Sequence, residues 1–133
     1  MKSQYRALFL ASLLATSVAH AQITGNQLKV VADRYNQSLP RMVAPTLRQE
    51  KLQVDGMVFT YVYTDTNRTG KQMNAANLVA NVTNDVFPEI CRAPDTGRML
   101  REGVTYRYVY FGNDRVVGAE LIVRIGDCKK YLR

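Results

Sequence analysis

The segment CRAPDTGRMLREGVTYRYVYF, residues 91–111, contains the features on which the predicted fold depends. It opens with a cysteine and closes with tyrosines that alternate with other side chains over 104–111. An alternation with a period of two is typical of a β-strand. Gly103 comes just before it, and glycine commonly ends a helix. We therefore expect a short helix over 95–102 and a strand directly after it.

The rest of the predicted sheet follows from the turns. The strand over 104–111 should pair with one over 116–125 across Gly112-Asn113-Asp114. An earlier hairpin is predicted over 47–64, because Asp55-Gly56 suits a two-residue turn. Both hairpins carry aromatic side chains at alternate positions. One face of the sheet should therefore collect Met57, Phe59, Tyr61, Tyr63, Tyr106, Tyr108 and Tyr110.

Two longer helices are predicted from apolar residues at three- and four-residue steps. The first covers 26–38, and Pro40 and Pro45 prevent its continuation. Its inward side should consist of Leu28, Val31, Ala32, Tyr35 and Leu39. The second covers 75–91, which ends at the cysteine of the opening segment. We predict one α+β domain over 22–133, in the order α-β-β-α-α-β-β, with helices packed on a mainly antiparallel sheet of about four strands.

The first 21 residues are predicted to be a cleaved signal peptide. Lys2 and Arg6 precede an uncharged apolar stretch over 7–18, and Ala19-His20-Ala21 is a small-x-small cleavage site. We expect a periplasmic protein, with release from the cell as the alternative. Cleavage lowers the formal net charge from +7 to +5. The remaining basic residues are scattered, which fits either solubility or an anionic partner such as lipid headgroups or an acidic protein patch.

The residues left after cleavage argue against an enzyme. His20 is the only histidine and would be removed, while Ser38 is the single serine that stays. Histidine-dependent nucleophilic catalysis and histidine-containing zinc sites are therefore excluded. The sequence has no glycine-rich phosphate loop either. We predict no enzymatic activity, no cofactor and no metal, and export disfavours nucleic acid as a partner.

The two cysteines, Cys91 and Cys128, are predicted to form a disulfide. An even pair in an exported protein favours a disulfide, and the spacing is not that of a CxxC redox motif. Such a bond would tie the end of the long helix to the end of the last strand. A small domain with a modest core gains a large share of its stability from one such bond.

In this combination the chain resembles the β-class pilotins of bacterial type II secretion systems. These small proteins bind the C-terminal segment of the outer-membrane secretin. The residues that carry the resemblance are Ser38-Leu39-Pro40, Cys91, Pro94, Leu100, Gly103, Tyr106 and Cys128. Pilotins of this class are acylated on a cysteine at the cleavage site, whereas no cysteine precedes Cys91 here. The resemblance implies the fold and a protein partner, but no stable membrane anchor.

We therefore predict a non-enzymatic binding module that holds the tail or helix of an envelope partner such as a secretin. A periplasmic inhibitor or immunity protein that blocks a toxin or hydrolase is the alternative. The helices should cover one face of the sheet, and the other face can stay partly open as a tyrosine-rich groove. The alternative is that the tyrosines only pack the sheet. The candidate partner-binding residues are Tyr61, Tyr63, Tyr106, Tyr108 and Tyr110.

Overall fold

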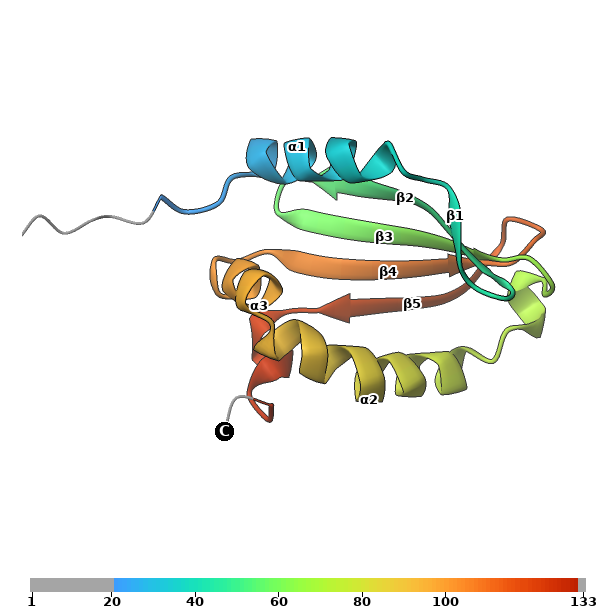
Figure 1. Ribbon diagram of the computed structural model, residues 1–133. Helices are drawn as coiled ribbons and strands as arrows, with labels where there is room; N and C mark the ends of the chain where they lie inside the picture. Colours follow the sequence, from blue (N-terminus) through green and yellow to red (C-terminus); the bar gives the residue numbers. More distant parts are fainter. Residues whose placement is uncertain (1–20, 132–133) are drawn as a thin grey trace, which may run out of the picture.

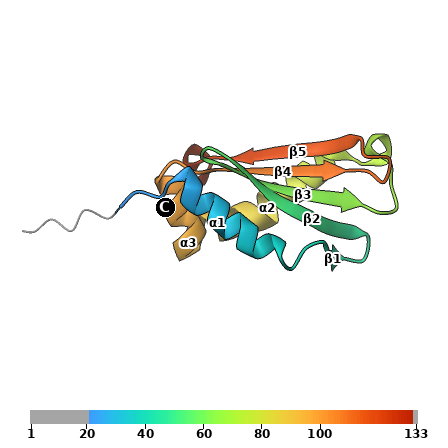
Figure 2. The ribbon, with the colours of Figure 1, turned by 90° about the horizontal axis from the view of Figure 1, so that it is seen from above.

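The computed structural model describes residues 21–131 and shows one sheet with helices on a single face (Figures 1 and 2). The predicted signal peptide, apart from Ala21, lies outside the described residues. Short 3₁₀ helices occur at Gly70–Gln72 (η1) and Ile125–Cys128 (η2). The main elements are α1 (Gly25–Asn36), β1 (Arg41–Ala44), β2 (Leu47–Asp55), β3 (Val58–Asp65), α2 (Ala75–Arg92), α3 (Pro94–Arg101), β4 (Thr105–Phe111) and β5 (Val117–Val123).

Within residues 21–131 the sheet has five strands in the order β1-β2-β3-β4-β5. The α+β class is confirmed, and every pairing is antiparallel except that of β3 with β4. That pair is parallel because the chain crosses over through α2 and α3 between the two strands. The sequence did not predict β1, a four-residue edge strand between Pro40 and Pro45, where the prolines were used only to end the preceding helix.

Local sequence accounts for the ends of the helices. Thr24 and Gln27 form a capping box at the start of α1, and each satisfies a backbone N–H of the other. Pro94 stands at the first turn of α3, where a missing N–H costs nothing. Gly103, with φ +96°, ends the connection between α3 and β4, as predicted.

The aromatic row lies on the face of the sheet that carries the helices. Phe59 and Tyr106 are 4% and 1% exposed and belong to the same core as Leu28 and Leu100 from α1 and α3. This corrects the expectation that the tyrosine-rich face is the open one. The face turned away from the helices instead carries valine, threonine and charged side chains, because it consists of the alternate positions of the same strands.

Candidate partner-binding strip between two helices

Two pairs of tyrosines stack across the parallel strands β3 and β4. The register places Tyr61 beside Tyr108 and Tyr63 beside Tyr110. The ring centroids are 4.9 Å and 5.0 Å apart, and the rings are tilted from parallel by only 5° and 13°. Such offset stacking holds each ring in place beyond its burial alone. We call these four residues the tyrosine strip.

The tyrosine strip lies between two helices rather than beneath one. Helix α1 packs against β2, and helix α2 packs against β5, so that β3 and β4 run between them (Figure 1). The rings of the strip fill this space. Tyr108 and Tyr110 are only 7% and 5% exposed, while Tyr61 and Tyr63 are half-buried.

The phenol hydroxyls of the strip have no hydrogen-bond partner among the described residues. None of the four donates or accepts a hydrogen bond with another residue of the part described, 21–131. Over the same residues, no buried side-chain nitrogen or oxygen lacks a partner. Each hydroxyl therefore keeps at least a small contact with solvent, although the rings behind it are packed.

Tyr106 differs from the other predicted tyrosines. It is 1% exposed, and its hydroxyl donates to Sδ of Met99 at 3.7 Å. Its ring meets Phe59 edge-on, with centroids 6.0 Å apart. The sheet brings all five candidate tyrosines onto one face, but the role of Tyr106 there is core packing.

The position of Asn36 fixes the orientation of α1 over the strip. Its side-chain amide accepts from the N–H of Leu52 at 2.7 Å and donates to the C=O of Leu52 at 2.9 Å. These backbone groups lie on the edge of β2 away from β3, so Asn36 faces outward. Val31 projects about 140° around the helix from Asn36, which turns it toward the strip. It is 48% exposed.

Tyr35 completes this wall of the strip. It is 37% exposed, and its phenol is close enough to contribute to the raised pKa values of Tyr61 and Tyr63. The sequence predicted Val31 and Tyr35 as inward-facing residues. The prediction that these two residues are buried is wrong, because α1 packs on the sheet through the narrower line of Leu28 and Ala32. The apolar stripe of α1 is wider than this one line of contact, and that width was the sequence signal for an exposed apolar wall.

Arg41 adds a positive charge at one end of the strip. Its guanidinium donates to the hydroxyl of Tyr35 and lies 5.2 Å from the centre of that ring.

Burial raises the pKa of Tyr61 to about 12, and the neighbouring phenol of Tyr35 adds to the effect. Burial alone raises the pKa of Tyr110 to about 12. The phenols of the strip are therefore neutral at pH 7 and can both donate and accept hydrogen bonds.

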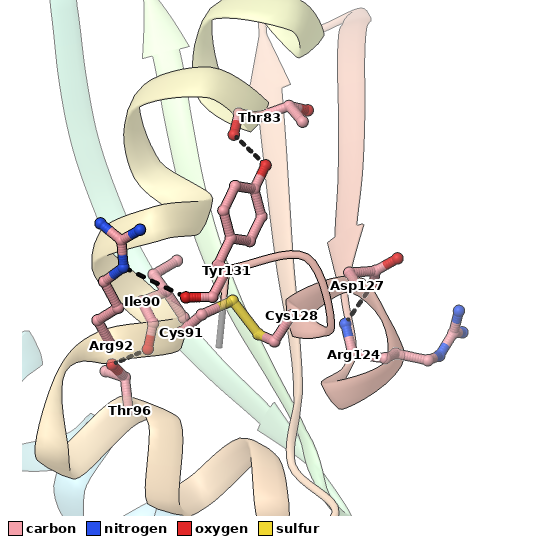
Figure 3. The surroundings of a disulfide bond; sticks show 9 residues. All are labelled: Thr83, Ile90, Cys91, Arg92, Thr96, Arg124, Asp127, Cys128 and Tyr131. Atoms are coloured by element: carbon pink, nitrogen blue, oxygen red, sulfur yellow. Dashed lines mark hydrogen bonds between the residues drawn. A yellow bond between two sulfur atoms is a disulfide. The ribbon is translucent and has the colours of Figure 1, made fainter. Parts of the chain in front are cut away.

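The predicted disulfide joins Cys91 to Cys128 and fastens the far end of α2 (Figure 3). The two Cα atoms are 5.5 Å apart, and both cysteines are buried. Tyr131 lies beside the bond, with its hydroxyl 3.4 Å from the carbonyl of Thr83. Thr96 donates to the carbonyl of Ile90 at 2.8 Å. These contacts hold the end of α2, and with it one wall of the strip.

Over residues 21–131 no group of three or more histidine, cysteine or carboxylate side chains could hold a metal ion. Over that same range no helix is long and apolar enough to cross a membrane.

No protein-family model and no curated protein sequence matches the chain. Its fold is nevertheless found among solved structures. A Pseudomonas aeruginosa protein provisionally described as secreted superposes with a TM-score of 0.68 and 16% identity, over 79% of this chain and 92% of that one. The pilotin EpsS of the Vibrio vulnificus type 2 secretion system gives 0.60 and 13% identity, over 79% and 94%.

The type II secretion pilotin AspS of Vibrio cholerae gives a TM-score of 0.56 and 14% identity, over 78% of this chain and 94% of that one. At such identities the likeness establishes the fold. The predicted resemblance to pilotins is thereby confirmed at the level of the fold.

Proposed function

We propose that this chain is an exported binding module of the pilotin type. It holds the C-terminal helix or tail of an envelope partner, with a secretin as the first candidate, against the tyrosine strip. The observation that carries the proposal is the row of four phenol hydroxyls between α1 and α2, each with some solvent contact and without a hydrogen-bond partner among residues 21–131.

The chemistry of the strip suits an amphipathic segment. Tyrosine supplies a large apolar ring and one hydrogen-bonding tip, and its ordering costs little entropy because stacking already fixes the ring. Val31 adds exposed apolar surface beside the tips. A partner helix could place aliphatic side chains on Val31 and its own polar side chains on the hydroxyls. Arg41 would favour a carboxylate at one end of that helix.

Rigidity of the site supports the same role. The strip lies on two central strands, and its walls are held by the Asn36 amide on one side and by the disulfide on the other. A surface fixed before binding loses less conformational entropy on association. Such a site can bind a short segment without first having to fold around it.

The test measures binding of one labelled peptide, the C-terminal segment of the secretin encoded in the same genome. Fluorescence anisotropy compares residues 22–133 with the Val31→Asp and Ile122→Asp variants. Val31 faces the strip, and Ile122 is similarly exposed, at 38% against 48%, but belongs to the other face. We expect Val31→Asp to weaken binding about tenfold or more, and Ile122→Asp to leave it unchanged.

Equal affinity of all three proteins would overturn the proposed site. A peptide that binds none of them would contradict the secretin as partner. Capture of a toxin or hydrolase from periplasmic extract, lost in Val31→Asp, would instead favour the inhibitor alternative.

A further inference from the structure

The face of the sheet opposite the tyrosine strip contains a hollow. It is a cavity of about 720 Å³ that opens to solvent at the end of the sheet where β3 and β4 finish. We call it the basic trough. The lining residues that matter here are Arg48, Glu50, Lys51, Val62, Phe111 and Arg115. Its position makes it independent of the strip and of the proposed function.

Irregular strand pairing builds this trough. In β2 the pairing moves from Gln49 with Tyr63 to Lys51 with Val62, so Glu50 is an extra residue. In a regular strand Glu50 and Lys51 would point to opposite faces, but the bulge lets both line the trough. Bulges of this kind commonly re-aim side chains beside functional sites.

Two more irregularities surround the same end of the sheet. The pairing of β1 with β2 skips Val43, and that of β4 with β5 skips Gly118. Arg115, on the turn after β4, has φ +62°, which is uncommon for a residue other than glycine. Of these features, the bulge at Glu50 and the left-handed Arg115 contribute residues that line the cavity.

The charges around the trough do not cancel. Arg48 donates to Glu50 at 2.8 Å, which leaves that pair neutral. Lys51 and Arg115 form no ion pair with any residue of the described range 21–131. Asp114 is not among the residues that line the trough, and its carboxylate accepts from the N–H groups of Gly70 and Val116. The charged side chains that do line the trough therefore sum to an excess of two positive charges.

The apolar floor and the open side of the trough limit the kind of molecule that can bind there. Val62 is 7% exposed and Phe111 is half-buried, so the floor is apolar between cationic walls. A small molecule is usually enclosed on most sides, whereas an open trough leaves one side of its occupant in water. This arrangement suits a chain segment that enters and leaves at the ends of the trough. A segment in which apolar and acidic side chains alternate would match the apolar floor and the cationic walls of the trough.

We propose that the basic trough binds an extended acidic peptide segment of a partner protein. Its carboxylates meet Lys51 and Arg115, and an apolar side chain lies on Val62 and Phe111. This would give the domain two protein-binding faces on opposite sides of one sheet.

The test uses a fluorescein-labelled ten-residue peptide with five glutamates and two leucines, and the same peptide with glutamines in place of glutamates. We expect saturable binding of the acidic peptide, at least about tenfold tighter than that of the glutamine peptide. The double reversal Lys51→Glu/Arg115→Glu should weaken binding about tenfold or more. The matched control Lys29→Glu/Arg101→Glu changes the net charge equally on the helix side and should bind like the wild type.

A third variant separates loss of binding from loss of structure. Glu50→Gln removes the one carboxylate that lines the trough and frees Arg48, so it should bind the acidic peptide about threefold tighter. Equal weakening by both double reversals would mean that only overall charge attracts the peptide, and would overturn the site. Equal binding of an oligogalacturonide of the same charge would overturn the choice of peptide as occupant.

Discussion

The ring of Tyr61 lies flat against the ring of Tyr108, with centroids 4.9 Å apart and planes 5° from parallel. The two residues are direct neighbours across the parallel pair β3 and β4. This contact exists only because the crossover through α2 and α3 returns the chain beside β3. A surface made of such pairs is rigid before any partner arrives.

The first prediction concerns the ionisation of these phenols. Burial raises the pKa of Tyr61 and of Tyr110 from 10.0 to about 12. The stability that depends on their neutral form is complete below pH 10 and is lost as the pH rises toward 12. Ultraviolet absorbance of the phenolate should therefore show tyrosines that titrate only as the fold is lost. Titration of all seven tyrosines of residues 22–133 near pH 10 would contradict the packing described here.

The second prediction concerns the disulfide. The bond closes a loop of 37 residues, which corresponds to about 4 kcal/mol of unfolding free energy. The Cys91→Ala/Cys128→Ala variant should lose about that amount in urea denaturation, as should the reduced wild type. An unchanged denaturation midpoint in both would show that the bond does not stabilise the fold.

The third prediction concerns the edge of β2. Asn36→Ala removes both hydrogen bonds to Leu52 and should lower the unfolding free energy by about 1–3 kcal/mol. The freed edge should also raise self-association, measured by light scattering. Asn26→Ala changes the same residue type in α1, at an exposed position, and is the matched control. Equal effects of the two variants would rule out the proposed role of Asn36.

The fourth prediction concerns acid stability. Asp65 is 2% exposed, and burial by itself raises the pKa of its carboxyl. Hydrogen bonds from the N–H groups of Asn67 and Arg68 and from the Arg68 guanidinium outweigh burial, so the pKa is lowered overall. Its contribution is thus present above pH 3.8, the ordinary value, and is lost as the pH falls through the lowered pKa.

Asp65→Asn should cost about 1–3 kcal/mol at neutral pH and reduce the loss of stability between pH 4 and pH 2, followed by circular dichroism. Asp33→Asn, at an exposed position, is the control and should leave the acid transition in place. A wild-type acid transition in Asp65→Asn would assign the effect to other groups.

Local signals in the sequence were enough to predict most of the fold. Asp55-Gly56, Gly103 and the alternation over 104–111 predicted both hairpins and the end of α3. The two cysteines predicted their own bond. Strand β1 was missed because its pairing with β2 depends on residues beyond its own four.

The site was harder to predict because it lies on the face that carries the helices, in the space between α1 and α2. The tyrosines were found, but alternation cannot tell which face of a sheet the helices will cover. Val31 and Tyr35 had the spacing of core residues, and only the outward position of Asn36 turns them toward the strip. The basic trough depends on bulges, which shift side chains between faces without a clear sequence signal.

The most direct measurement of the central claim is site-specific photocrosslinking in living cells. A photoreactive phenylalanine replaces Val31 beside the strip or, as the matched control, Ile122 on the opposite face. We predict one dominant adduct from position 31, identified by mass spectrometry as an envelope protein such as a secretin, and no such adduct from position 122. The same adduct from position 122, with none from position 31, would contradict the tyrosine strip as the partner-binding site.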